Sequence, residues 1–436
     1  MRATISIALA TLALAGCTEL LDEAGRPCPC GPGWSCCANV NLCVPGGSAC
    51  PGEASTSTGS SSGSTGAGCT QGSTGSGSTT GSSTTTSGTT FGSSGTTGVM
   101  RILEPAVSYP LAGQPIGVAL GDENGDGRAD VIVAETSMLT VLAAQADGGL
   151  ASSAGTTPLA SAPTAVVALD LDGDPNEDLV VAQTDEGGPA LAVWRGRGDG
   201  TFTAGDRYGL PQKATLLAAG SIWPAGGPVV VAVDGQGTAS IFLGDGLGHL
   251  GTPTTLTVPA SPVALVLDHF LAPNRLDAVI ASSTQVTLVP NLAAPGTPVT
   301  FAYGPQRALA SGDVDGDGRV DFMTLSLTNN DVVAYLNAGD GGFVPQSPTQ
   351  LAGVGPTWAA FANISGAPAV VALNAQSNDV TVERDFGGTF VFGGIYPMSG
   401  PPLGLAVGDL NGDQSADVVV LGGACGTGSV QVLLSN

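Results

Sequence analysis

Asp313-Val-Asp315-Gly-Asp317-Gly-Arg-Val-Asp321 is the stretch that decides the fold, because it recurs along the chain. The three sister segments read Asp122-Glu-Asn124-Gly-Asp126-Gly-Arg-Ala-Asp130, Asp170-Leu-Asp172-Gly-Asp174-Pro-Asn-Glu-Asp178 and Asp409-Leu-Asn411-Gly-Asp413-Gln-Ser-Ala-Asp417. The four segments start at 122, 170, 313 and 409, which are 48, 143 and 96 residues apart. These spacings are close to one, three and two multiples of 48. Such a period indicates a repeat architecture with three copies that have lost the motif.

Stepping by 48 residues locates the drifted copies at Gly220–Gly226, Asp268–Asp277 and Phe361–Ala367, so the chain carries seven units. An apolar run precedes each loop and another follows it, as Ile116–Leu120 and Val131–Ala134 do around the first loop. A third run ends in a Gly-Asp-Gly turn. Short β-branched runs between turns are typical of hairpins. The pattern predicts an all-β, seven-bladed β-propeller over residues 99–436.

The two ends of the repeat region predict how the ring closes. The last unit stops after its third run, Val430–Leu434, while Ile102–Pro110 lies ahead of the first loop without a unit of its own. An open ring would expose sheet edges that invite aggregation. We therefore expect the N-terminal strand to complete the seventh blade.

These loops and turns resemble the FG-GAP (VCBS-type) repeat family, in which the fold is the seven-bladed propeller of integrin α subunits. The resemblance covers about residues 99–436. It implies a binding function through loops on one face, with a protein or a glycan as the partner. It also implies that calcium ions in the hairpins are structural.

The acidic loops themselves predict cation sites. Side-chain oxygens at positions 1, 3 and 5, a backbone carbonyl at position 7 and a carboxylate at position 9 can surround one hard cation. The candidate ligands are Asp122, Asn124, Asp126, Arg128, Asp130, Asp170, Asp172, Asp174, Asn176, Asp178, Asp313, Asp315, Asp317, Arg319, Asp321, Asp409, Asn411, Asp413, Ser415 and Asp417. We expect about four Ca²⁺ ions, because Mg²⁺ demands stricter octahedral geometry. Solvated acidic turns without an ion are the alternative.

The N-terminus predicts export and a lipid anchor. Residues 1–16 have a basic start, a short apolar stretch and a small-residue end, as a secretory signal does. Leu14-Ala15-Gly16-Cys17 resembles the lipobox of bacterial lipoproteins, which implies a lipidated Cys17 at the head of residues 17–27. The expected location is the cell envelope, at the outer membrane or cell surface, with the lipid as the only membrane contact.

A small disulfide-rich segment and a flexible linker follow. Cys28, Cys30, Cys36, Cys37, Cys43 and Cys50 lie within residues 28–50 and predict three disulfides of open connectivity, with a zinc site as the competing interpretation. Residues 51–98 are rich in Ser, Thr and Gly and predict a disordered tether. Cys69 and Cys425 remain unassigned.

Charge and missing motifs narrow the function. With 12 Lys and Arg against 36 Asp and Glu, the net charge of −24 excludes nucleic-acid binding. We find no catalytic motif, and His249 and His269 lie in different units. Arg197-Gly-Asp199 is interpreted as part of a turn. We expect a surface-anchored calcium-binding propeller for adhesion or envelope scaffolding, and no enzyme. The alternatives are a structural envelope lipoprotein without a ligand and a polysaccharide-active enzyme.

Overall fold

The computed structural model describes residues 34–37, 42–45, 102–151, 155–222, 227–302, 306–385, 389–424 and 427–435. The chain divides into two compact units, one containing residues 100–436 and the other spanning 14–99. The signal segment 1–16, Cys17, Cys28, Cys30, Cys50, the linker 51–98, Cys69 and Cys425 lie outside the described residues. Over the described ranges, the structure contains no helix suited to crossing a membrane.

The smaller unit is described at one hairpin. Strands β1 (Trp34–Cys37) and β2 (Leu42–Pro45) pair antiparallel. Their register places Cys36 opposite Cys43 and Cys37 opposite Leu42. Two of the predicted half-cystines therefore share one cross-strand position.

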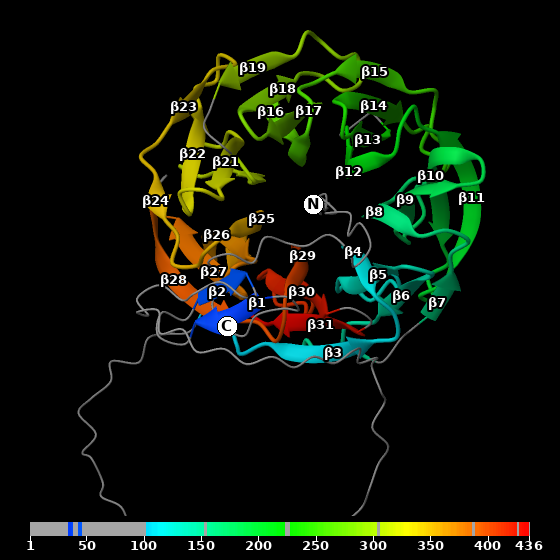
Figure 1. Cartoon of the computed structure of the whole chain (residues 1–436). Helices are drawn as coiled ribbons and strands as arrows, with labels where there is room; N and C mark the ends of the chain where they lie inside the picture. The colour runs from blue at the N-terminus through cyan, green and yellow to red at the C-terminus, as the bar shows by residue number, and fades with distance from the viewer. Residues whose placement is uncertain are drawn as a thin grey trace, which may run out of the picture. The chain divides into compact units, whose positions relative to one another are not determined.

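The larger unit is a ring of seven antiparallel sheets, or blades, which confirms the predicted fold (Figure 1). Blade 1 comprises β4 (Pro115–Gly121), β5 (Asp130–Glu135), β6 (Met138–Leu142) and β7 (Gly155–Pro158). Blade 2 comprises β8 (Pro163–Leu169), β9 (Asp178–Asp185), β10 (Gly188–Gly196) and β11 (Phe202–Gly209). Blade 3 comprises β12 (Ala214–Ser221), β13 (Pro228–Asp234), β14 (Thr238–Leu243) and β15 (Thr254–Thr257).

The next blades follow the same order. Blade 4 comprises β16 (Pro262–Ala272), β17 (Arg275–Ser282), β18 (Gln285–Val289) and β19 (Val299–Ala302). Blade 5 comprises β20 (Ala308–Gly312), β21 (Asp321–Ser326), β22 (Asp331–Asn337) and a fourth strand in two pieces, β23 (Phe343–Pro345) and β24 (Thr349–Gln350). Blade 6 comprises β25 (Pro356–Ile364), β26 (Ala367–Asn374), β27 (Asp379–Asp385) and β28 (Phe390–Pro397).

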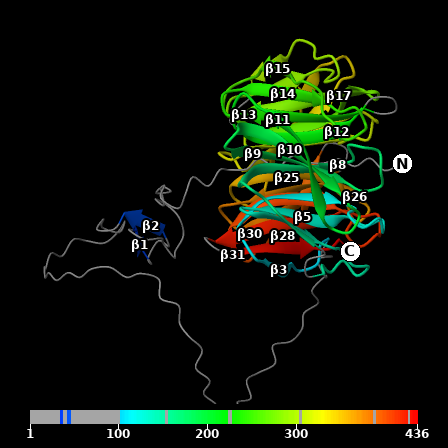
Figure 2. The same ribbon diagram turned by 90° about the vertical axis from the view of Figure 1, so that its right-hand side faces the viewer.

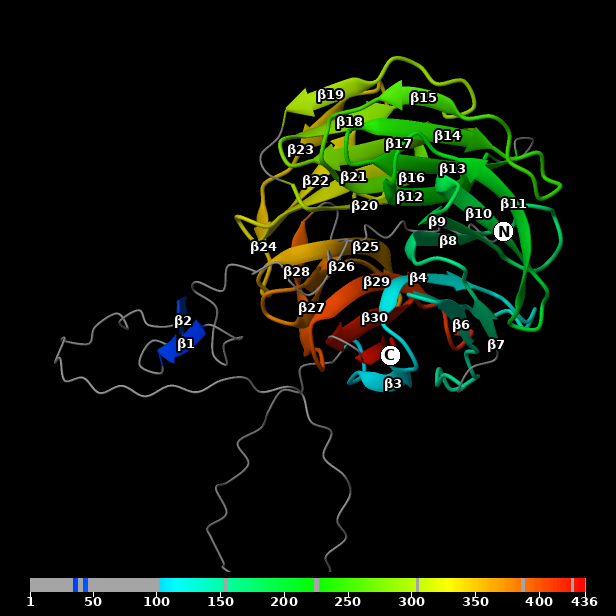
Figure 3. The same cartoon turned by 45° about the vertical axis from the view of Figure 1, so that its right-hand side comes forward.

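The seventh blade closes the ring as the sequence predicts. It comprises β29 (Pro402–Gly408), β30 (Asp417–Ala424), β31 (Thr427–Leu433) and the N-terminal strand β3 (Val107–Leu111). β3 pairs antiparallel with β31, with Val107 opposite Val432 and Tyr109 opposite Val430. Figures 1 and 3 show the cyan β3 beside the red β31.

The apolar core lies between the blades. Each of the seven clusters of buried side chains joins two neighbouring blades. Along β5, Val131 and Val133 face blade 7, whereas Ile132 and Ala134 face blade 2. Because successive side chains of a strand point to opposite faces, a continuous apolar run serves two interfaces at once. This double burial explains why the runs are short and unbroken rather than alternating.

The strand order gives the propeller two distinct faces. Within each antiparallel blade, the connections from first to second strand and from third to fourth strand lie on one face. The connections from second to third strand, and those between blades, lie on the other. We call them the hairpin face and the connection face. Figure 2 shows the strands running across the disc from one face to the other.

Candidate functional site

The four acidic loops occupy equivalent places on the hairpin face. Each links the first and second strands of its blade: β4 to β5, β8 to β9, β20 to β21 and β29 to β30. The prediction that they are hairpin loops is therefore confirmed. Glycines allow the tight backbone, since Gly316 and Gly318 have φ angles of 78° and 84°, which other residues rarely adopt.

The loop of blade 5 gathers its carboxylates most closely. One oxygen from each of Asp313, Asp315 and Asp317 lies within 4.8 Å of the others. Among the described residues, these three form the cluster of His, Cys, Asp or Glu side chains close enough to hold a metal ion together. Backbone N–H groups hold the carboxylates in place: Gly316 and Gly318 donate to Asp313 at 2.8 and 3.0 Å, and Arg319 donates to Asp317 at 2.8 Å. Three convergent carboxylate oxygens are a donor set that suits a hard divalent cation.

The carboxylate at position 9 has a structural task in every acidic loop. Asp321 is fully buried and accepts hydrogen bonds from Val314 N at 2.8 Å and Asn337 N at 2.7 Å. The same two bonds, to position 2 of the loop and to the chain beside the third strand, recur at Asp130, Asp178 and Asp417. These aspartates tie each loop to its blade. Their predicted role as calcium ligands stays a prediction.

Burial raises the pKa values of these position-9 aspartates, which we call the anchor aspartates. Desolvation raises the pKa of Asp130 and of Asp178 to about 6, although backbone hydrogen bonds oppose the shift. Desolvation also raises the pKa values of Asp321 and Asp417. A cation placed beside these groups would favour their charged form.

The drifted segment of blade 4, Asp268–Asp277, keeps an aspartate at its end but has no acidic residue between its first and last positions. Asp277 is fully buried and accepts from Leu271 N at 2.9 Å and from Asn291 N at 2.7 Å. Arg275 Nε lies 2.9 Å from its carboxylate. Here the guanidinium of Arg275 offsets the charge of the buried carboxylate.

Arginines also approach the intact loops. Arg128 and Arg319, at position 7, form ion pairs with Asp126 and Asp317 at position 5 of their own loops. In blade 2, Arg195 Nη1 lies 3.4 Å from Asp172 Oδ2. The position-3 carboxylate of that loop therefore has a partner outside the loop, whereas Asp315 is hydrogen-bonded to the backbone N–H of Asp317.

Two glutamates that the sequence analysis did not select lie between blades 1 and 2. Glu123, at position 2 of the first loop, is 0% exposed, and neither of its carboxylate oxygens has a hydrogen-bond partner. Glu177, at position 8 of the second loop, also has a buried oxygen without a partner. Desolvation and the neighbouring carboxylates raise the pKa of Glu123 to about 9 and that of Glu177 to about 7.

A signal for these glutamates was present in the repeat. The other acidic loops carry Leu171, Val314 and Leu410 at position 2, and Ala129, Val320 and Ala416 at position 8. Glutamates at loop positions that are apolar in the sister loops indicate that the environment of these two positions differs between blades 1 and 2. The sequence alone did not reveal that the two places adjoin across a blade interface.

The connection face differs from the hairpin face in charge. The described connections from second to third strand are 136–137, 186–187, 235–237, 283–284, 327–330 and 375–378. Glu186 is the one charged residue in these segments, and Ser, Thr, Asn, Gln and Gly provide most of the rest. The propeller therefore presents acidic loops on the hairpin face and nearly uncharged second-to-third strand loops on the connection face, where the described connections between blades add Lys213 and Arg307.

The remaining sequence candidates lie in ordinary positions. Arg197-Gly-Asp199 forms the turn between β10 and β11, where Asp199 accepts a hydrogen bond from Thr201 N. His249 is in the turn after β14 and contacts Asp206, and His269 Nδ1 lies 2.9 Å from the carbonyl of Arg275. The structure thus places the two histidines in blades 3 and 4, in separate networks.

Comparisons with known proteins agree with this architecture. A family model described as FG-GAP-like repeat matches residues 122–181 and 313–366. These ranges contain the acidic loops of blades 1, 2 and 5. No curated protein sequence matches the chain significantly.

Solved structures are similar to the chain at low sequence identity. The BBS1N chain from a complex with ARL6DN has 14% identity and a TM-score of 0.56, with 77% of this chain and 97% of that chain covered. A protein from Lactobacillus plantarum has 16% identity and a TM-score of 0.49, with 66% and 86% covered. A lectin from Agrocybe aegerita that recognises non-reducing terminal N-acetylglucosamine has 15% identity and a TM-score of 0.44, with 71% and 81% covered. At 14% identity the likeness to the BBS1N chain concerns the fold alone.

Proposed function

Because this chain carries FG-GAP-like repeats on a seven-bladed propeller, we propose that it is an envelope-anchored, calcium-binding scaffold that binds a protein or a glycan without catalysis. The observation that carries the proposal is the division of the ring into a hairpin face with the acidic loops and a connection face whose second-to-third strand loops are polar and carry a single charge, Glu186. A rigid scaffold that collects variable loops on one side is typical of binding proteins.

The connection face is the proposed contact surface. Its exposed side chains include Thr136, Ser137, Thr328, Asn329, Gln376 and Ser377. Hydroxyl and amide groups both donate and accept hydrogen bonds, so they suit sugar hydroxyls and peptide backbones alike. With almost no charge on these loops, recognition would depend little on ionic strength.

The hairpin face is the proposed calcium face. In blade 5, Asp313, Asp315 and Asp317 would hold one Ca²⁺, and the ion would cancel the repulsion between their carboxylates. The ion would stiffen the hairpin and take no part in a reaction. Equivalent ions are proposed for the loops of blades 1, 2 and 7.

Titration calorimetry with Ca²⁺ on the full chain tests the calcium part. We expect uptake by the wild type and a smaller uptake by Asp315→Asn, which keeps the shape of the loop but removes one charge. At a calcium concentration of 100 times Kd, one site stabilises the fold by about 2.7 kcal/mol. A melting temperature that does not respond to calcium or chelator would contradict this assignment.

The partner part is tested by binding of the immobilised full chain to a glycan array and to envelope protein fractions. The double variant Thr328→Glu/Gln376→Glu places two charges on the connection face and should abolish saturable binding. Asp147→Asn is the matched control, since Asp147 is exposed between β6 and β7 on the hairpin face. If binding were lost in Asp147→Asn and kept in the double variant, the partner would bind the hairpin face and not the connection face. Absence of any saturable partner would favour a structural envelope role.

The envelope location rests on the lipobox-like sequence Leu14–Cys17. Labelling with a palmitate analogue should mark the wild type and leave Cys17→Ser unlabelled. An equally labelled variant would exclude this anchor.

A further inference from the structure

The side chains of Glu123 and Glu177 approach the same glycine where blades 1 and 2 meet. Glu123 belongs to the β4–β5 loop of blade 1 and Glu177 to the β8–β9 loop of blade 2. Both approach Gly121: a methyl group on that residue would lie 3.3 Å from Glu123 Oε1 and 2.9 Å from Glu177 Cγ. Because Gly121 has no side chain, both glutamate side chains can pack against it.

These carboxylates have no counter-charge in the described residues. Glu123 is 0% exposed, both of its oxygens lack a hydrogen-bond donor, and Oε2 of Glu177 is likewise buried without one. No ion pair of the described chain includes either residue. Burying a carboxylate without a partner is strongly unfavourable, and a second carboxylate nearby adds to that cost.

The fold itself does not require glutamates at this place. At the interface between blades 7 and 1, the equivalent positions are Leu410 and Ala129, which pack in one apolar cluster. The same backbone thus accepts a fully apolar pair one interface away. The glutamates between blades 1 and 2 therefore need an explanation other than packing.

We propose that Glu123 and Glu177 form a divalent-cation site between blades 1 and 2, separate from the sites within the hairpin loops. With both carboxyl groups deprotonated, the pair would offer an all-oxygen, doubly negative donor set that suits a hard cation of the Ca²⁺ class, with water completing its coordination. The cation would neutralise the buried charges and join the two blades. Unlike an ion within one hairpin, it would crosslink residues 54 positions apart in the chain, from 123 to 177.

Equilibrium dialysis of the full chain against ⁴⁵Ca²⁺ alone tests this site. The variant Glu123→Gln/Glu177→Gln keeps the side-chain volumes and should bind one ion fewer per chain than the wild type. Glu123→Leu/Glu177→Ala reproduces the Leu410–Ala129 pair and should show the same loss together with a higher melting temperature in chelator. Equal calcium stoichiometry in the wild type and the double-glutamine variant would overturn the proposal.

A loop variant separates this site from the hairpin ions. Asp315→Asn/Asp317→Asn should lose a different ion, and the losses in the combined variant should add. If the glutamate variants alone lower the stoichiometry, the hairpin assignment fails while the interblade site stands. Crystals soaked in Mn²⁺ give a second test that needs no variant: an anomalous peak between Glu123 and Glu177 supports the site, and peaks confined to the loops refute it.

Discussion

At the residue scale, the most informative side chain is the aspartate at position 9 of each loop. It is the member of the motif that is buried, and it accepts two backbone hydrogen bonds in the four acidic loops and in the drifted loop of blade 4. The acidic residues inside the loop are lost in that blade, since residues 269–276 contain none, whereas Asp277 has kept its place. This contrast separates the part of the motif that folds the hairpin from the part that suits a cation.

Replacing one anchor should destabilise the propeller even without calcium. Asp321→Ala leaves the N–H groups of Val314 and Asn337 buried without an acceptor. Each such loss costs about 1–3 kcal/mol. We expect a decrease of about 2–5 kcal/mol in the free energy of unfolding, measured in urea with chelator. Asp315→Ala is the control and should change stability by less than about 1 kcal/mol under the same conditions, because its carboxylate bonds only within the exposed loop.

A buried glutamate away from the loops makes stability depend on pH. Glu383, on β27, is 1% exposed, and desolvation raises its pKa to about 7 from an ordinary value of 4.5. Between these values the unfolded chain has released the proton that the folded chain retains. Stability contributed by this group is therefore present below about pH 4.5 and declines as pH rises towards 7, by at most about 3 kcal/mol.

Glu383→Gln should remove that dependence. Urea unfolding of the wild type and the variant at pH 5 and at pH 7.5 measures it, with chelator present so that metal binding does not contribute. The free energy of unfolding of Glu383→Gln, compared with that of the wild type, should increase as pH rises. A stability difference that stays constant over this range would show that Glu383 keeps its ordinary pKa in the fold.

At the element scale, the N-terminal strand carries the closure of the ring. β3 supplies five cross-strand pairs to β31, and the segment before it is also fixed. The N–H groups of Ile102 and Leu103 donate to Tyr396 Oη at 3.1 and 2.9 Å, and both side chains are buried against blades 6 and 7. The segment thus joins two blades as well as completing one.

Removing β3 should open the propeller. A chain that begins at residue 113 loses Ile102, Leu103 and the pairing of β31, whereas a chain that begins at residue 100 keeps them. Burial of the two apolar side chains alone contributes about 1.5–3 kcal/mol each. We expect the shorter chain to melt at a clearly lower temperature and to self-associate through the exposed β31 edge in size-exclusion chromatography. Identical melting curves would show that the ring closes without β3.

At the scale of the whole molecule, stability comes from seven interfaces around a closed ring. Each apolar cluster found among the described residues is shared by two neighbouring blades. Damage at one interface therefore affects both neighbours. The ring should unfold as one cooperative unit rather than blade by blade.

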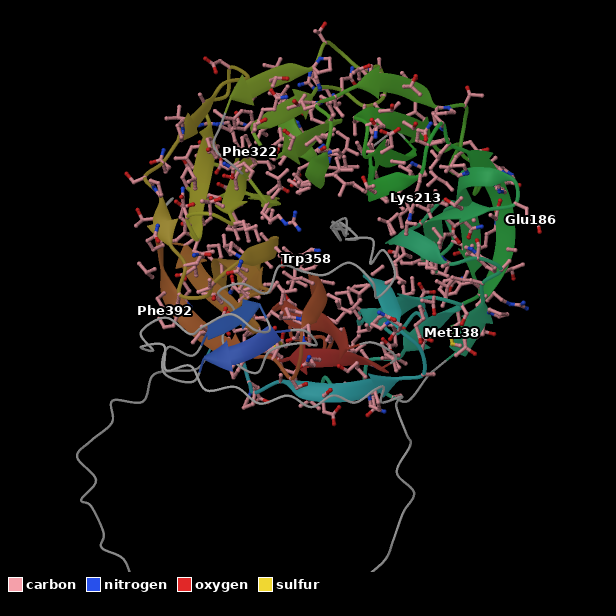
Figure 4. The ribbon with its side chains drawn as sticks, in the orientation of Figure 1. Met138, Glu186, Lys213, Phe322, Trp358 and Phe392 are labelled. Carbon is pink, nitrogen blue, oxygen red and sulfur yellow. The ribbon has the colours of Figure 1, made fainter. Side chains whose placement is uncertain are left out.

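A substitution that creates a cavity between blades 4 and 5 tests this cooperativity. Phe322 is 1% exposed and contacts the rings of Phe270, Tyr335 and Phe343, whereas Phe392 on β28 is 57% exposed (Figure 4). Phe322→Ala should lower the free energy of unfolding by about 3–5 kcal/mol and shift a single calorimetric transition. Phe392→Ala should change it by less than about 0.5 kcal/mol. Two separate transitions in Phe322→Ala would indicate that blades unfold independently.

The sequence by itself determined the architecture of this protein. The 48-residue period, the short apolar runs and the glycine-containing turns specify blades locally, and the unmatched segments at the two ends of the repeat region predict the closing strand. The loop residues at positions 1 to 9 were also identified, because their spacing is a local property of one hairpin.

Only the tertiary structure decided which of those residues are buried and what lies across a blade interface. Asp321 receives its second hydrogen bond from Asn337, on a strand that the hairpin meets after folding. Glu123 and Glu177 adjoin because β4 and β8 are neighbours in the closed ring. The physical reason is that strand and turn formation depend on near neighbours in sequence, whereas burial and charge pairing depend on the packing of whole blades.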